Sequence, residues 1–186
     1  MKQKLIIGLL FILVLLQIAS PLSMIVKREL VLKNGIAFRF KTVPIDPSDP
    51  FRGRYISLRV EANKAPKPQG VALELGQKVY AQIVVDENGY AEISQITTQK
   101  PKAPAFLDAK ISSFGDGNEV FLDLPIDRYY MEEKAAPQAE KIYREHSEHD
   151  KQDAYVIVKV KNGFAVVEGL YIGGQKIENL LLKRLK

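Results

Sequence analysis

The chain has no cysteine among its 186 residues. Without thiols it can form neither disulfide staples nor thiolate metal sites. It also lacks low-complexity tracts, so we expect residues 29–186 to fold throughout. That length is sufficient for one ordinary domain with its own core.

Histidine is scarce, with two residues in the whole chain. His146 and His149 lie three residues apart, would share one face of a helix and would offer two imidazoles to a metal. A tight zinc site would then need carboxylates as further ligands. We expect instead a solvated, charged helix at 145–150, and no metal or cofactor.

Motifs of common enzyme classes are absent as well. The chain contains no Gly-x-Ser-x-Gly nucleophile elbow, no Walker loop and no Gly-x-Gly-x-x-Gly turn. A Ser-His-Asp triad has only the two histidines to draw on. A Ser–Lys dyad stays open because lysines are plentiful. We therefore expect a binding protein rather than an enzyme. A catalytic function stays open as the alternative.

The longest apolar run is Leu5–Val26, 22 residues without a charge. At 1.5 Å per residue it spans the hydrocarbon core of a bilayer, about 30 Å. A cleaved signal peptide is the rival interpretation, but Pro21 directly follows the small residues Ala19 and Ser20, and the run stays apolar beyond them. We expect an uncleaved single-pass anchor over residues 1–28.

Charge and topology suggest where the remaining domain lies. Positive residues flank the run on both sides, so the positive-inside rule barely distinguishes the two orientations of the helix in the membrane. A single N-terminal span with a large following domain most simply gives a cytoplasmic N-terminus. We expect residues 29–186 outside the cytoplasm, at the inner membrane. The net charge of +5 favours anionic lipid headgroups as neighbours, and no nucleic-acid motif is present.

The soluble part is predicted to be mainly β, of the α+β class, with antiparallel hairpins. Alternating apolar and polar residues predict strands at 36–43, 55–60, 79–85, 90–97, 111–114, 119–124, 154–160 and 164–170. In the second of these, Ile56, Leu58 and Val60 should face one way. Asn-Gly pairs indicate tight turns at 88–89 and 162–163. Two prolines and a glycine indicate a loop at 61–70.

Two segments have the apolar spacing of helices, and for one of them a strand is the alternative. Residues 137–148 predict one short helix, with Pro137 in its first turn and Ala139, Ile142 and Tyr143 on one side. In the tail, Ile177, Leu180, Leu181 and Leu185 share a helical face, although a ragged strand is the alternative.

A repeated pattern suggests two similar halves, 29–107 and 108–186. Val43-Pro44-Ile45-Asp46 resembles Leu124-Pro125-Ile126-Asp127, and each corner is followed by a Tyr-initiated hairpin. A degenerate duplication sharing one core explains this order; recurring hairpin chemistry is the alternative.

The segment 43–60 (VPIDPSDPFRGRYISLRV) is the candidate binding site. Prolines stiffen it, and the aspartates and Gly53 favour tight turns. It presents guanidiniums that either pair with the local carboxylates as a structural network or bind an external carboxylate or phosphate. The candidate binding residues are Asp46, Asp49, Arg52, Gly53, Arg54 and Tyr55.

The same segment resembles the bacterial GDYXXLXY family. The matching residues are Pro44, Asp46, Pro47, Asp49, Pro50, Phe51, Arg52, Gly53, Tyr55 and Leu58. Arg54 and Val60 depart from the family motif, where an aspartate and a tyrosine stand, so an essential catalytic carboxylate at position 54 is untenable. The resemblance covers most of the chain. It implies a membrane-anchored protein, and family members tend to be encoded beside polytopic membrane proteins, which suggests a partner.

Three functions follow as hypotheses. The first is an accessory or binding role, in which the 46–55 corner docks onto an integral membrane protein. The second is an extracytoplasmic enzyme or binder acting on an anionic envelope component, a lipid headgroup or glycan held by Arg52, Arg54 and Tyr55. In the third, the segment only builds the fold.

Overall fold

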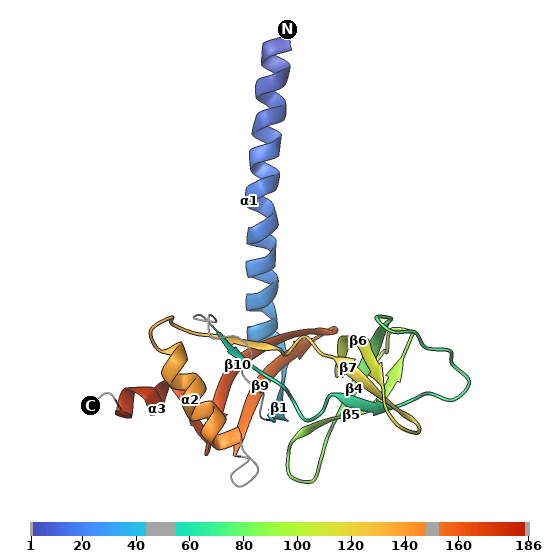
Figure 1. The fold of residues 1–186 in the computed structure, drawn as a ribbon. Coiled ribbons are helices and arrows are strands. Elements are labelled where there is room, and N and C mark those ends of the chain that lie inside the picture. The colour runs from blue at the N-terminus through green and yellow to red at the C-terminus, as the bar shows by residue number, and fades with distance from the viewer. Residues whose placement is uncertain (1, 44–54, 148–152, 185–186) are drawn as a thin grey trace.

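A long N-terminal helix stands on a β-rich domain of antiparallel sheets (Figure 1). The computed structural model describes residues 2–43, 55–147 and 153–184. This arrangement confirms the predicted class, an apolar helix followed by a mainly β domain with short helices.

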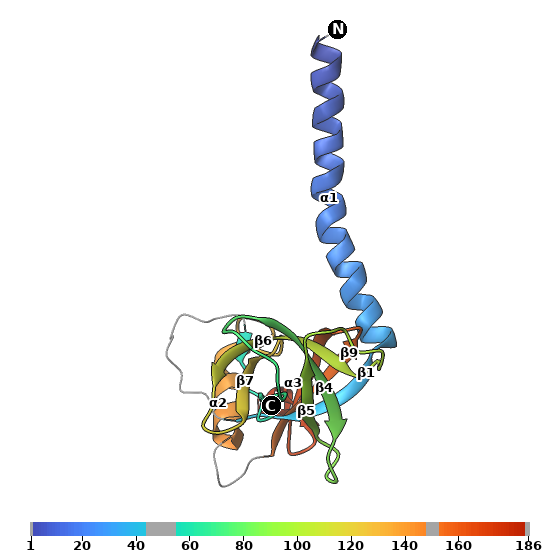
Figure 2. The ribbon, with the colours of Figure 1, turned by 90° about the vertical axis from the view of Figure 1, so that its right-hand side faces the viewer.

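Helix α1 (Lys2–Asn34) carries the apolar run. In the described chain, one helical stretch, Ile6–Asn34, is long and apolar enough to cross a membrane, and its apolar part is exposed. Figure 2 shows that α1 bends along its length. Pro21, inside the helix, accounts for a bend, because proline lacks the N–H that would bond to the preceding turn.

The C-terminal end of α1 is docked against the domain. Val31 is buried although its neighbours in the helix are mostly exposed. The amide of Gly35 donates to the Val31 carbonyl at 2.8 Å and ends the helix. A Cβ at Gly35 would lie 2.5 Å from that carbonyl oxygen and 3.2 Å from the Lys159 Cβ, so only glycine allows this close approach. The helix therefore continues past the predicted boundary at residue 28.

The first sheet receives the chain directly after α1. Its strand order is β1-β9-β10-β11. The bounds are β1 Ile36–Lys41, β9 Ala154–Lys161, β10 Phe164–Ile172 and β11 Gln175–Lys176. The register of β1 against β9 runs from Ile36↔Val160 to Lys41↔Tyr155, and the β9–β10 turn holds Asn162 and Gly163 at positive φ. This is the predicted Asn-Gly hairpin.

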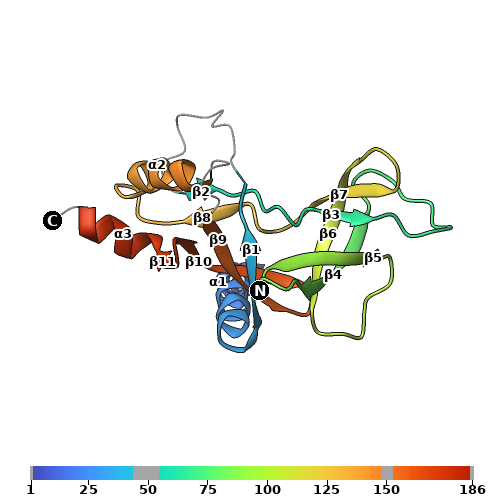
Figure 3. The same ribbon diagram turned by 90° about the horizontal axis from the view of Figure 1, so that it is seen from below.

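Two short helices lie on one side of this sheet (Figure 3). Helix α2 (Ala136–Ser147) confirms the predicted helix, with Ala139, Ile142 and Tyr143 buried and Pro137 in its first turn. Helix α3 (Ile177–Arg184) confirms the helical interpretation of the tail, and it buries Ile177 and Leu181.

The second sheet has five strands in the order β3-β7-β6-β4-β5. The bounds are β3 Lys64–Pro66, β4 Lys78–Val85, β5 Ala91–Thr97, β6 Phe106–Phe114 and β7 Glu119–Asp123. Its edge strands β3 and β5 contact each other, so the sheet curls towards closure. Pro66 fits in β3 because an edge strand needs fewer ladder donors.

The two sheets share one apolar core. A parallel bridge joins Leu107 of β6 to Gly163, and the Asp108 amide donates to the Gly163 carbonyl at 2.9 Å. The largest side chains with almost no exposed surface are Phe40, Phe106, Ile56, Leu107, Ile111, Ile142, Leu170 and Ile177.

A two-stranded ribbon completes the fold. Strand β2 (Tyr55–Ser57) pairs with β8 (Arg128–Tyr130). Ile56, Leu58 and Val60 are all buried, as the alternation predicted. The prediction of an unbroken loop at 61–70 was wrong at β3. Strand β8 and the first half of β6 were not predicted from the sequence.

The predicted halves are interleaved. Strand β6 spans the boundary at 107–108, and each sheet contains strands from both sides of it. The duplication itself stays a prediction.

Candidate functional site

One member of the predicted binding set, Tyr55, lies in the described chain, as the first residue of β2. The others lie outside the described residues; they are Asp46, Asp49, Arg52, Gly53 and Arg54. What the structure defines is the surface around Tyr55 and the residues on both sides of the segment.

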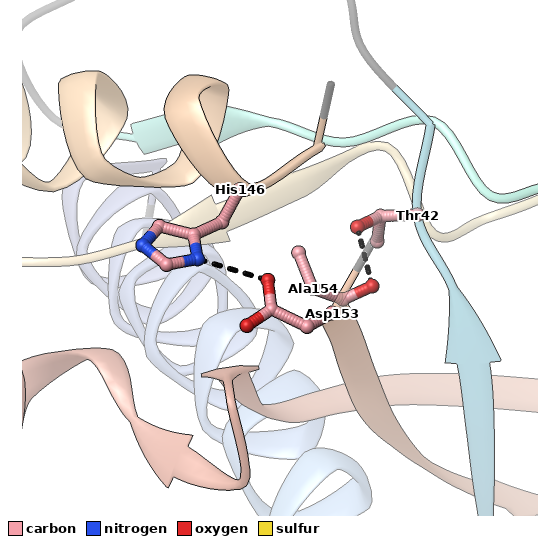
Figure 4. Close-up of polar contacts among 4 residues, drawn as sticks. All are labelled: Thr42, His146, Asp153 and Ala154. Atoms are coloured by element: carbon pink, nitrogen blue, oxygen red, sulfur yellow. Dashed lines mark hydrogen bonds and ion pairs between the residues drawn. The ribbon is translucent and has the colours of Figure 1, made fainter. Parts of the chain in front are cut away.

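Both flanks of this segment are fixed to the core. Before it, the Val43 amide donates to the Arg59 carbonyl at 2.9 Å, and the Tyr143 hydroxyl donates to the Val43 carbonyl at 3.4 Å. The buried Thr42 hydroxyl donates to the Ala154 carbonyl at 3.0 Å (Figure 4). The chain therefore leaves β1 from a well-anchored point.

After the segment, Tyr55 joins a small group of polar aromatic and charged side chains. We call Tyr55, Asp127, Arg128 and Tyr130 the Tyr55 cluster. The register pairs Tyr55 with Tyr130, and their ring centroids are 5.6 Å apart at an interplanar angle of 54°. The guanidinium carbon of Arg128 lies 5.1 Å from the Tyr55 ring centroid, in a cation–π arrangement. Antiparallel pairing of β2 and β8 puts all three on one face.

The electrostatics of the cluster keep Arg128 charged and oriented. A hydrogen bond from the guanidinium to the Tyr130 side chain, and next the charge of Asp127, raise the pKa of Arg128 above its usual value. The Arg128 Nε lies 3.2 Å from the Asp127 Oδ2. Asp127, Arg128 and Tyr130 are exposed. Arginine and tyrosine held on a rigid ribbon are typical of the anchor residues of protein interfaces.

The opposite face of β8 secures the ribbon to the core. Tyr129 is buried, and its hydroxyl donates to the Glu178 Oε1 at the start of α3. Burial, and next this hydrogen bond, raise the pKa of Tyr129 far above its usual value. The other Glu178 oxygen is also buried and has no hydrogen-bond partner within the described ranges. This contact connects β8 to α3.

The sequence contained part of this information. Asp127 was visible as the end of the second Pro-Ile-Asp corner, the counterpart of Asp46. Nothing in the local sequence indicated that Arg128 lies over Tyr55, because the contact depends on long-range pairing of two three-residue strands.

A second aromatic surface lies on the first sheet. Tyr155 of β9 stacks on Tyr171 of β10 at 5.3 Å and 7°, and Tyr90 meets Tyr155 edge-on at 6.1 Å. Arg39 lies 5.8 Å from the Tyr155 centroid and Lys41 lies 5.3 Å from that of Tyr90. We call Tyr90, Tyr155 and Tyr171 the tyrosine stripe.

A groove of about 470 Å³ opens beside the stripe, between β3 and β5. Lys41, Lys64 and Tyr90 line it, together with the carboxylates of Glu61, Asp86, Glu92 and Glu119. Since the carboxylates outnumber the lysines, the groove does not favour an anion.

One of the two candidate metal ligands, His146, lies in the described chain. The His146 Nδ1 lies 2.9 Å from the Asp153 Oδ1, a contact that joins the end of α2 to the start of β9 (Figure 4). His149 lies outside the described residues. Elsewhere in the described ranges, no group of three or more histidines, aspartates and glutamates is arranged to hold a metal ion.

Comparison with known proteins gives one match. The family described as GDYXXLXY protein matches residues 17–170, a range that includes part of α1, the candidate segment and the Tyr55 cluster. The chain matches none of the curated proteins and none of the solved structures with which it was compared.

Proposed function

The chain belongs to the GDYXXLXY family, and from this premise we propose that it is a single-pass membrane protein whose β-rich domain binds an integral membrane protein as an accessory subunit. The proposed site is the inner (cytoplasmic) membrane, with the domain outside the cytoplasm. The bilayer, through α1, and the integral membrane protein are the two partners.

One observation carries the proposal: the apolar side chains of α1 are exposed in the folded chain. Aliphatic side chains from Ile6 to Val26 form a surface that no other described element covers. An exposed apolar surface of this length needs a hydrocarbon environment.

The sequence after Ala19 and Ser20 supports an anchor over a removed signal peptide. The helix runs through Ala19 and Ser20, where a signal peptidase would cut, and ends at Asn34. Val31, in its last turns, is buried against the domain. Cleavage there would leave Val31 on the domain, so the argument for an uncleaved anchor depends on the run that stays apolar beyond Ser20.

The Tyr55 cluster is the proposed docking surface. Its tyrosines and arginine are preorganised by their ring and cation–π contacts and by the Asp127 contact, so binding would cost little side-chain entropy. Its member Tyr55 also directly follows the segment with the other predicted binding residues.

Photo-crosslinking in living cells tests this function. A photoreactive amino acid in place of Tyr130 should give a discrete adduct to a membrane protein, identified by mass spectrometry. The matched control places the same amino acid at Phe114, another exposed aromatic residue, in the second sheet. Equal labelling from both positions, or none from a correctly inserted chain, would contradict the docking surface.

The membrane topology has a separate test. Because the chain contains no cysteine, Asn118→Cys gives a single labelling site on an exposed turn. A membrane-impermeant maleimide should label this variant in spheroplasts if the domain lies outside the cytoplasm. Labelling only after lysis would place the domain inside.

A second candidate function is binding of an anionic envelope component. The tyrosine stripe favours it at Tyr155, outside the lining of the acidic groove, because a ring beside Arg39 suits a sugar or headgroup that carries a phosphate or carboxylate. It predicts saturable binding by the full chain that weakens with salt and is lost in Arg39→Gln. No binding across a panel of anionic lipids and glycans would exclude it.

A further inference from the structure

The way α1 joins the domain fixes the depth of nearby residues relative to the bilayer. Leu5–Val26 is about 33 Å long, close to the roughly 30 Å hydrocarbon core. Lys27 follows this run directly, so its backbone lies at the boundary between hydrocarbon and headgroups. The helix continues unbroken to Asn34, so the domain cannot move far from that boundary.

Phe164 lies close to the same boundary. The Lys27 ammonium is 4.1 Å from the centroid of the Phe164 ring, in cation–π contact. The ring therefore lies within one lysine side-chain length plus 4.1 Å of the last apolar turn of α1. Phe164 is 36% exposed at the start of β10, directly after the tight turn at Asn162 and Gly163.

The charges around this turn match an anionic surface. Lys27, Arg28 and Lys33 lie on the last turns of α1, and Lys159 and Lys161 lie at the end of β9. Three carboxylates oppose these five cations: Glu168, at 4.0 Å from Lys159, Glu29 on α1 and Asp108 beside Gly163. A surplus of positive charge within the headgroup layer is attracted to anionic lipids.

We propose that the β9–β10 turn, Lys161–Phe164, is a second membrane contact, with the Phe164 ring in the interfacial layer and Lys27 and Lys161 among the lipid phosphates. The inference depends on the membrane anchor of the proposed function. Aromatic and aliphatic side chains commonly settle at this depth, with basic residues reaching the headgroups. A domain held by one membrane helix can rotate about the axis of that helix. A second membrane contact fixes the orientation of the domain relative to the bilayer.

Tryptophan fluorescence tests the contact, because the chain has no tryptophan of its own. Phe164→Trp, in the full chain reconstituted into lipid vesicles, places one reporter in the turn. The matched control is Phe114→Trp. Phe114 is 44% exposed and also lies under a lysine, Lys67, at 5.6 Å, but it is at the far end of β6, about 23 Å along the strand from Leu107.

The vesicles consist of phosphatidylcholine, alone or with an equal part of phosphatidylglycerol, with chains brominated near the headgroup. The reporter at 164 should emit at shorter wavelength than the one at 114 and should lose intensity to bromine. Its loss should be greater with phosphatidylglycerol. A reporter at 164 that behaves like the one at 114 would overturn the proposal.

A third variant separates failure of the turn from failure of the anchor. Leu13→Trp lies in the apolar part of α1 and should be quenched by bromine near the chain ends. If Leu13→Trp is quenched and Phe164→Trp is not, the anchor stands and the second contact is wrong. If neither is quenched, the anchor itself fails, and with it the contact.

An independent label covers the case in which Phe164→Trp does not fold. Lys161→Cys and Asn118→Cys each give a unique thiol for an environment-sensitive dye. The dye at 161 should brighten on insertion into vesicles, and the dye at 118 should not. Brightening of neither dye in a folded, inserted chain would count against membrane contact and favour a turn that stays in water.

Discussion

Tyr129 is the residue whose chemistry is most strongly set by its surroundings. It is buried between β8 and α3, and its hydroxyl donates to the Glu178 carboxylate. Its pKa is raised, first by burial and next by that hydrogen bond, so the folded chain holds Tyr129 neutral. The unfolded chain ionises tyrosine near pH 10.

We expect Tyr129→Phe to destabilise the fold by about 1–3 kcal/mol, because it leaves a buried carboxylate oxygen without its donor. The stabilisation by wild-type Tyr129 is complete below pH 10. It declines above pH 10, since only the unfolded state then releases the proton. Denaturant unfolding of both proteins from neutral pH to pH 11 measures the gap between them.

The exposed neighbour Tyr130 supplies the control for this experiment. Tyr130→Phe changes the same atoms on the opposite face of β8 and should cost little stability. Equal losses from the two variants, or a gap that widens above pH 10, would show that the Tyr129 hydroxyl is not the stabilising group.

At the scale of elements, the junction between α1 and the first sheet is packed through one face of the helix. Val31 is 4% exposed and its neighbour Leu30 is 50% exposed, so only one face of the last turns of α1 packs against the domain. Gly35 then allows the chain to turn directly into β1.

We expect Val31→Ala to lower the stability of the full chain in detergent by about 2 kcal/mol, because two buried methyl groups are removed. It should also increase amide exchange in β1, which follows the helix. Leu30→Ala removes at least as much apolar surface from the adjacent position and should leave both quantities nearly unchanged. Similar effects from both substitutions would mean that the junction is not packed through Val31.

Elements with a long pattern were predictable from the sequence. The hairpin of β4 and β5 was found because alternation flanks Asn88-Gly89, where Gly89 has φ +82° and Asp86 accepts from the Asn88 and Tyr90 amides. Strands of three residues, such as β3 and β8, are too short to show a period of two.

The candidate site was predictable to a lesser extent for the same reason. Tyr55 was selected from its own segment, whereas Arg128 and Tyr130 join it only through pairing of distant strands. The segment contains no motif that specifies a reaction, so its residues alone did not identify a function.

At the scale of the whole molecule, Gly163 connects the two sheets. Its carbonyl accepts from Asp108, and its φ of +87° is in the left-handed region. A Cβ there would lie 2.1 Å from the Asp108 Oδ1 and 2.8 Å from the Phe106 ring, which belongs to the buried core.

We expect Gly163→Ala to destabilise the chain by about 2–4 kcal/mol, from the left-handed backbone and from overpacking against Phe106. Gly89→Ala has the same kind of φ, +82°, with open space around the added Cβ, and should cost only about 1–2 kcal/mol. Thermal unfolding with probes in each sheet measures the loss of stability in both variants. Equal losses would indicate that the close approach of the two sheets at Gly163 does not contribute to stability.

The continuous junction of α1 with the first sheet also couples the orientation of the domain to that of the helix. Where the hydrocarbon layer is thin, an apolar helix longer than the layer tilts to remain covered. With α1 inserted as proposed, and with its last turns packed on the domain through Val31, a small tilt of the helix would displace the outer end of the domain. The height of the Tyr55 cluster above the lipid would then change with bilayer thickness.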